Sequence, residues 1–159
     1  MTASFLNSRR GCSLMKIEFY LHFENGMPKG TAQQKGETIK YRRNQAGKVV
    51  PYIKHYRTDK VSAERGLFIY GMKRHAPKEP IKGPVKLTVF LFFDVKDRSL
   101  WGKYKPTRPD CDNYVKEIKD AMTASRFWND DNQVVDLRVV KRYAEKATIY
   151  IRMEDPSDD

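Results

Sequence analysis

Four carboxylates flank a short stretch of helical periodicity, and they form the densest chemical signal in the chain. Asp110 and Asp112 stand before that stretch, and Asp130 and Asp131 follow it. Carboxylate oxygens are the hard ligands that Mg²⁺ or Mn²⁺ requires, with water and a substrate phosphate completing the coordination shell. A bound ion of this kind can activate water and stabilise the transition state of phosphodiester hydrolysis. The pattern therefore indicates metal-dependent cleavage as one possible chemistry.

Lys116 lies four residues after Asp112, so the two share one face of the expected helix. There it could orient the nucleophile or offset charge on a phosphate. A purely structural interpretation is also open: Asp-x-Asp at a helix start is commonly a cap, and an aspartate four residues before a lysine is an ordinary surface ion pair. The run 130–132 likewise has a typical turn composition. From spacing alone, the structural interpretation is the commoner one.

The helix between the two acid pairs is predicted from Val115, Ile118 and Met122, which repeat at helical spacing. Asp110 or Asp112 would cap its free amides. The start and end of this helix lie about 18 Å apart, so tertiary structure would have to bring the second acid pair back towards the first.

The other elements follow from hydrophobic periodicity. Alternation over 15–23 predicts a strand, 59 to about 74 a helix, and the apolar run 85–93 a central strand. Alternation over 135–139 and again over 149–153 predicts a C-terminal β-hairpin. Together these elements predict an α+β fold, in which two main helices pack on one mixed β-sheet.

Length and composition predict a single domain over residues 15–154, because 159 residues that are 40% hydrophobic bury one substantial core. We expect residues 1–14 to be a disordered leader and 155–159 an acidic disordered tail. No apolar run of about 18 residues and no secretory signal is present, which predicts a cytoplasmic protein without a membrane role. Cys12 and Cys111 are not expected to form a disulfide, and the histidines show no zinc-ligand spacing.

The charge balance predicts an anionic partner, since 31 Lys and Arg against 20 Asp and Glu give a net charge of +11. Two basic segments, 24–48 and 94–108, are read as exposed loops, the first with room for a short hairpin. Trp101 and Tyr104 could stack on unpaired bases, or pack against their own loop. The basic side chains predicted to contact DNA are Lys29, Lys35, Lys40, Arg42, Arg43, Lys103, Lys105 and Arg108.

The acidic segment resembles the signature of the RusA-type Holliday junction resolvases. The shared pattern is DxDNxxK at 110–116, FWxDDxQVV at 127–135, and a following strand that contains Lys141. The resemblance is strong from Lys105 to about Arg142, and looser over the strand and basic loop that precede this region. It also implies the RusA-like arrangement of one mixed sheet and two helices.

The resemblance implies that Asp110, Asp112 and Asp131 bind Mg²⁺ or Mn²⁺ and that Lys116 is needed for cleavage. Asp130 remains a helper acid, because the sequence does not separate its role from that of Asp131. The family further implies a homodimer that nicks two strands symmetrically across a four-way DNA junction, and a phage or prophage setting.

The sequence thus leads to one main hypothesis, a metal-dependent endodeoxyribonuclease that resolves four-way junctions. A junction-binding protein without hydrolytic activity is one alternative, and a flap- or fork-specific nuclease of the same chemistry is the other. Of the remaining residues, Asp120 and Asp136 are expected to be solvated or paired, while Phe127 and Trp128 are expected to anchor the core.

Overall fold

The computed structural model describes residues 15–28, 35–57 and 59–156. Two short 3₁₀ turns, η1 and η2, accompany the helices and strands. In chain order the elements are β1 (Lys16–Phe23), β2 (Lys35–Arg43), β3 (Val49–Arg57), α1 (Asp59–Lys73), β4 (Val85–Asp94), η1 (Arg98–Leu100), α2 (Cys111–Ala124), η2 (Asp131–Gln133), β5 (Val134–Ala144) and β6 (Ala147–Glu154).

The main sheet has four strands in the order β1-β6-β4-β5. Strand β6 runs antiparallel to both β1 and β4, whereas β5 runs parallel to β4. The predicted central strand is confirmed, because β4 lies between two neighbours. The predicted α+β fold with a mixed sheet is confirmed as well.

The predicted C-terminal β-hairpin is wrong. Only two residues separate β5 from β6, but β4 lies between them in the sheet. Strand β5 instead pairs in parallel with β4, so α2 is the crossover of a β-α-β unit, as a parallel pair requires. Alternating side chains show that a segment is a strand, but they do not identify its neighbour, and this is why the pattern was misread.

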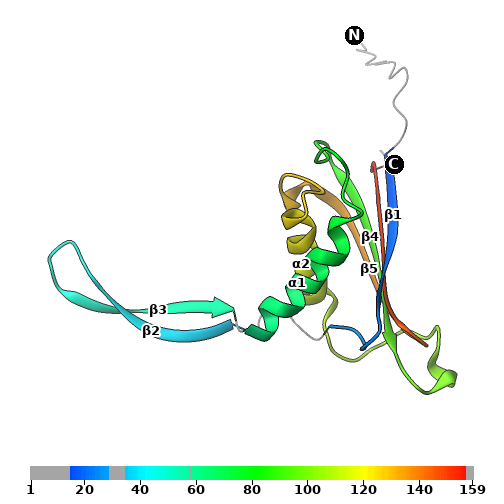
Figure 1. The fold of residues 1–159 in the computed structure, drawn as a ribbon, viewed down its shortest axis with the longest axis horizontal. Helices are drawn as coiled ribbons and strands as arrows, with labels where there is room; N and C mark the ends of the chain where they lie inside the picture. Colours follow the sequence, from blue (N-terminus) through cyan, green and yellow to red (C-terminus); the bar gives the residue numbers. More distant parts are fainter. Residues whose placement is uncertain (1–14, 29–34, 58, 157–159) are drawn as a thin grey trace, which may run out of the picture.

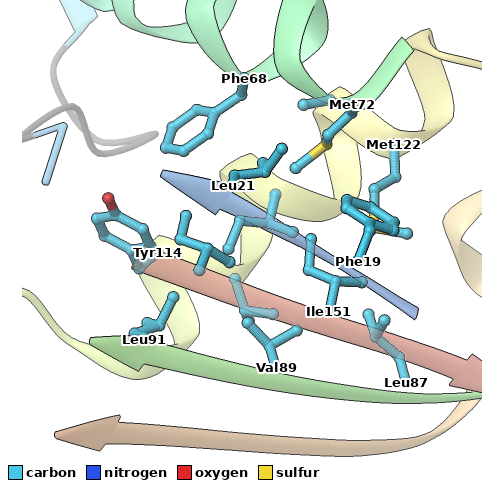
Figure 2. Packing of buried hydrophobic residues seen from close by; sticks show 14 of the residues in the cluster. Phe19, Leu21, Phe68, Met72, Leu87, Val89, Leu91, Tyr114, Met122 and Ile151 are labelled. Atoms are coloured by element: carbon cyan, nitrogen blue, oxygen red, sulfur yellow. The ribbon is translucent and has the colours of Figure 1, made fainter. Parts of the chain in front are cut away.

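Both helices cover the same face of the sheet (Figure 1). Figure 2 shows Phe68 and Met72 of α1 beside Leu21 of β1 and Met122 of α2 beside Phe19, in one cluster with the buried side chains of β4. Side chains along β4 alternate between fully and partly buried. The expected core anchors Phe127 and Trp128 are also buried. This packing fixes α2 against the strand that precedes it and the strand that follows it.

Strands β2 and β3 form a second, two-stranded antiparallel sheet. The first basic segment was predicted to be a loop with room for a short hairpin, but this hairpin continues to Arg57. It projects away from the four-stranded sheet (Figure 1). From Glu37 to Lys54 every side chain is exposed except that of Val50, which is half-buried. The hairpin is therefore an arm rather than part of the core.

The two ends of the domain meet beside β1 and β6. The amide of Met15 donates to the Asp155 carboxylate at 2.9 Å, so pairing extends one residue into the segment that was assigned to the tail. The predicted leader, 1–14, and residues 157–159 lie outside the described residues. Within the described part of the chain, no helix is both long and apolar enough to cross a membrane.

Candidate active site

Asp110 and Asp112 occupy the N-terminal end of α2. Asp110 is the N-cap residue, and its backbone carbonyl accepts the first helical hydrogen bond, from Tyr114 at 3.1 Å. Its carboxylate makes no capping hydrogen bond. Asp112 lies in the first turn, and both aspartates are exposed. Capping therefore does not account for the Asp110 side chain, and two carboxylates stand at the positive end of the helix dipole.

Lys116 lies one turn further along α2 and is also exposed. No salt bridge between Lys116 and Asp112 occurs among the described residues. The surface ion pair that the sequence allowed as an alternative is thus not formed. Asp110, Asp112 and Lys116 present two carboxylates and an ammonium group to solvent at one end of α2.

The opposite face of α2 is buried, and this orients the exposed face. Tyr114, Val115 and Ile118 are at most 4% exposed. The Tyr114 hydroxyl donates to the Pro28 carbonyl at 2.9 Å, which ties the helix to the segment after β1. Because this packing prevents α2 from rotating, the side chains of its first turn keep their direction.

Two lysines, here called the lysine clamp (Lys105 and Lys141), hold the turn that leads into α2. Lys141, on β5, donates to the carbonyls of Thr107 at 2.9 Å and Pro109 at 2.7 Å. Lys105 donates to the carbonyls of Thr107 and Arg108 and to the Thr107 hydroxyl. Charge-assisted bonds of this kind are stronger than neutral ones. The clamp therefore fixes the backbone immediately before Asp110.

Lys105 had been predicted to contact DNA, but its ammonium group is bonded within the turn. It also lies 5.1 Å from the centre of the Phe93 ring. Burial lowers the pKa of Lys105 from its ordinary value, and nearby Lys141 lowers it further, against an opposing effect of Tyr143. The sequence did not reveal this structural role. The only signal for the clamp was the lysine at 141 in the family signature.

At the other end of α2, Asp130 and Asp131 make different contacts, which the sequence did not distinguish. The Asp130 carboxylate accepts from the Asn132 amide at 2.9 Å, and Gln133 completes a reciprocal capping box around η2. Asp131 has no such role, and its carboxylate lies 3.2 Å from the Lys119 ammonium group. Asp130 therefore has a structural function, while Asp131 faces α2.

The three acids of the predicted metal site do not come together in one chain. Helix α2 has 14 residues and is therefore about 21 Å long. Strand β5 returns Lys141, rather than an acid, to the Asp110 end. No group of three or more His, Cys, Asp or Glu side chains that could hold an ion occurs among the described residues. Asp131 instead lines a surface pocket near the C-terminal half of α2, with Arg65, Asp120, Thr123, Ala124 and Asp130.

The expectation that Asp120 and Asp136 are paired is confirmed. Asp120 lies 3.6 Å from Arg65, and Asp136 lies 3.7 Å from Lys86. Both pairs are partly exposed, so each is expected to contribute little stability.

The remaining predicted DNA contacts are spread over two parts of the chain. Lys29 lies outside the described residues, and for Lys35 only the backbone is described. Trp101 donates its indole N–H to the Val95 carbonyl at 3.0 Å, as expected if it packs against its own loop. Tyr104 is 68% exposed, with the Arg142 guanidinium 4.3 Å from its ring centre. Of the basic residues predicted to contact DNA, those with exposed side chains are Lys40, Arg42 and Arg43 on the hairpin, and Lys103 and Arg108 before α2.

Comparison with known sequences extends the resemblance beyond the acidic segment. The profile of the family "Endodeoxyribonuclease RusA" matches residues 25–154, from the end of β1 to the end of β6. The chain belongs to the RusA endodeoxyribonuclease family. The family resemblance predicted from the signature between 110 and 141 is thereby confirmed.

Two relatives show how far the RusA-family likeness extends. "Crossover junction endodeoxyribonuclease rusA" of Lactococcus phage r1t is 35% identical over 147 residues, which cover 89% of this chain and 99% of that protein. The protein of the same name from Escherichia coli (strain K12) is 52% identical over 40 residues, 25% of this chain and 33% of its own length. This RusA-family chain therefore matches the phage protein almost from end to end, and the bacterial protein over one segment.

We predict that Asp130→Ala lowers the free energy of unfolding by about 0.5–1 kcal/mol, because it removes the cap of η2. Asp131→Ala removes only a partly exposed ion pair and should cost at most a few tenths of a kcal/mol. Urea unfolding of the two variants measures this difference. Equal losses would contradict the separate roles of the two acids.

We also predict that Lys141→Met lowers the cleavage rate by about ten- to a hundredfold, because small displacements of a reacting group have effects of this size. Lys141→Arg should restore part of the rate, since arginine keeps the charge and the donors. Amide hydrogen exchange at residues 110–113 should be faster in Lys141→Met. Unchanged exchange together with an unchanged rate would show that the clamp has no positioning role.

Proposed function

We propose that this protein is a Mg²⁺- or Mn²⁺-dependent endodeoxyribonuclease that resolves four-way DNA junctions as a homodimer, by paired symmetric nicks. The observation that carries the proposal is the exposed pair Asp110 and Asp112, of which Asp110 makes no side-chain capping hydrogen bond. Both lie within the segment matched by the RusA family. The name of the Lactococcus phage relative, a crossover junction endodeoxyribonuclease, supports four-way junctions as the substrate.

The donor set at the start of α2 fits a hard divalent cation. Asp110 and Asp112 supply carboxylate oxygens, and neither forms a salt bridge within the described residues. Mg²⁺ is commonly bound by one or two carboxylates, while water and substrate phosphate fill its other positions. When bound, the ion would supply Lewis-acid stabilisation and a water of lowered pKa.

A third carboxylate, Asp131, would come to this site from a second subunit. Within one chain Asp131 contacts Lys119 and lies beside the C-terminal half of α2. If two copies of α2 pack antiparallel about a two-fold axis, the N-terminal end of one helix lies beside the C-terminal end of the other. Asp110 and Asp112 of one subunit would then face Asp131 of the partner subunit. We therefore propose that the active site is shared between subunits.

The side chains around the shared site have separate roles in the proposed reaction. Asp110 and Asp112 would hold the cation, which would supply Lewis-acid stabilisation, and exposed Lys116 would offset negative charge on the scissile phosphate. The lysine clamp does not touch the substrate and keeps the turn before Asp110 in place. Lys119 neutralises Asp131 before the site is assembled.

The basic surface would supply most of the affinity for DNA. Lys40, Arg42 and Arg43 on the hairpin and Lys103 and Arg108 before α2 are exposed and can neutralise phosphates. Each such contact releases counterions, so affinity should fall steeply with salt whatever the DNA sequence. These phosphate contacts would bind any DNA sequence, whereas cleavage would depend on the metal held by the aspartates.

The direct test is cleavage of a labelled synthetic four-way junction in Mg²⁺ or Mn²⁺, with a matched linear duplex as the control. We predict paired nicks in the junction by the wild-type protein, and a loss of at least about a hundredfold in rate for Asp112→Asn, which removes a ligand. Asp136→Asn is the matched control, because it removes a paired surface carboxylate and should keep the wild-type rate.

Other outcomes would assign a different activity. Tight binding of the junction without cleavage in any divalent metal would identify a non-catalytic binding protein. Faster cleavage of flaps or forks than of four-way junctions would retain the chemistry and change the substrate.

A further inference from the structure

The hairpin arm has two chemically different faces. In an antiparallel pair, directly opposite residues place their side chains on the same face. Ile39 lies opposite Ile53, and Tyr41 lies opposite Pro51. With Val49 these residues form what we call the apolar face (Ile39, Tyr41, Val49, Pro51 and Ile53). Glu37 and Arg43 stand at its two ends.

The other side of the arm is the basic face (Lys40, Arg42, Tyr52 and Lys54). Lys40 lies opposite Tyr52, and the Arg42 guanidinium lies 5.5 Å from the centre of the Tyr52 ring. Two hydrogen bonds to Asn44 close the turn between the strands. The Lys48 amide donates to the side-chain Oδ1 of Asn44 at 2.9 Å, and the Gly47 amide donates to its backbone carbonyl at 3.0 Å. Gly47 has a φ of 75°, which glycine adopts without strain. The turn therefore pins the register that separates the two faces.

In the part of the chain that the structure describes, the apolar face is largely exposed. Ile39 is 64% exposed, Tyr41 is 70% exposed, and Val49 and Ile53 are each 59% exposed. An isolated two-stranded hairpin is only marginally stable in water, and a row of exposed large apolar side chains marks an interaction surface. The apolar face therefore has the character of a surface that binds a partner.

Charge identifies the chemistry of that partner. Residues 35–57 contain seven lysines and arginines and one glutamate. With this excess of positive charge, the arm would attract a polyanion. A two-stranded ribbon also has the dimensions of a DNA groove. DNA is therefore the partner that both the shape and the charge of the arm fit.

We infer that the apolar face inserts against unstacked bases at the branch point of the junction, while the basic face binds the flanking phosphates. Isoleucine and proline are among the side chains that act as wedges between bases, and tyrosine stacks on exposed bases. In a continuous duplex, insertion must first unstack a base step, whereas at a branch point the continuous stack is already interrupted. The arm would therefore make binding selective for branched DNA. This inference rests on the branched substrate of the proposed function.

The test uses a four-way junction with 2-aminopurine beside the branch point, in EDTA so that no cleavage occurs. The variant is the full chain with Ile39→Thr and Ile53→Thr, which keeps β-branched side chains and so keeps the hairpin. We expect its junction affinity to fall by about tenfold and the fluorescence increase on binding to disappear. Its affinity for linear duplex should stay within about twofold, since phosphate contacts are untouched.

Two further variants make the result specific. Val135→Thr is the matched control, because it makes a similar change at an exposed valine of β5, outside the arm, and should leave every readout unchanged. Tyr41→Ser provides an independent test of the apolar face, with the same expected loss at the junction. Lys40→Gln with Lys54→Gln should weaken binding to junction and duplex alike and reduce the salt dependence of both.

Wild-type junction affinity and fluorescence in both apolar-face variants would overturn the inference. Dissociation of the Ile39→Thr, Ile53→Thr protein into monomers in sedimentation would overturn it too, because it would assign the apolar face to a second copy of the chain. Failure of the proposed nuclease activity would appear separately, as an uncut junction in Mg²⁺ or Mn²⁺ with this binding result intact.

Discussion

The length of α2 is the constraint on which the rest of the site depends. A helix of 14 residues is a rod of about 21 Å, and its buried face fixes both its position and its rotation. Asp110 and Asp112 stand at one end, and Asp131 lies beside the other half. Among the described residues, no three acidic side chains gather where one ion could bind them. This is why we propose that a second subunit supplies Asp131.

Different contacts position the residues at the two ends of α2. At the first end the lysine clamp fixes the turn before Asp110 through backbone carbonyls, so the carboxylates stay free for a ligand. At the second end Asp130 caps η2, which leaves Asp131 turned towards Lys119. Structural hydrogen bonds are thus made by residues next to the proposed ligands. This division explains how acidic turns that look like ordinary caps can also carry chemistry.

Much of this arrangement could be read from the sequence, because local periodicity is set by local contacts. Alternation placed β1 and β4, helical spacing placed α1 within about one residue of its bounds, and Val115, Ile118 and Met122 placed α2 between the two acid pairs. Features that depend on distant contacts were missed. The neighbour of β5 was misassigned, the bonds of Lys105 to the turn before α2 were not foreseen, and Asp130 could not be separated from Asp131. The metal ligands and DNA contacts remain predictions, since they concern partners outside the chain.

The measurement that tests the shared site most directly is cleavage by mixed dimers of Asp112→Asn and Asp131→Asn subunits. Each variant alone should be inactive. In a shared site, one of the two sites of the mixed dimer combines Asp110 and Asp112 of one subunit with Asp131 of the other, so nicking of one junction strand should return. If each subunit instead holds its own three acids, every site in the mixed dimer lacks one ligand. Absence of nicking by mixed dimers, with wild-type protein active in the same assay, would contradict the shared site.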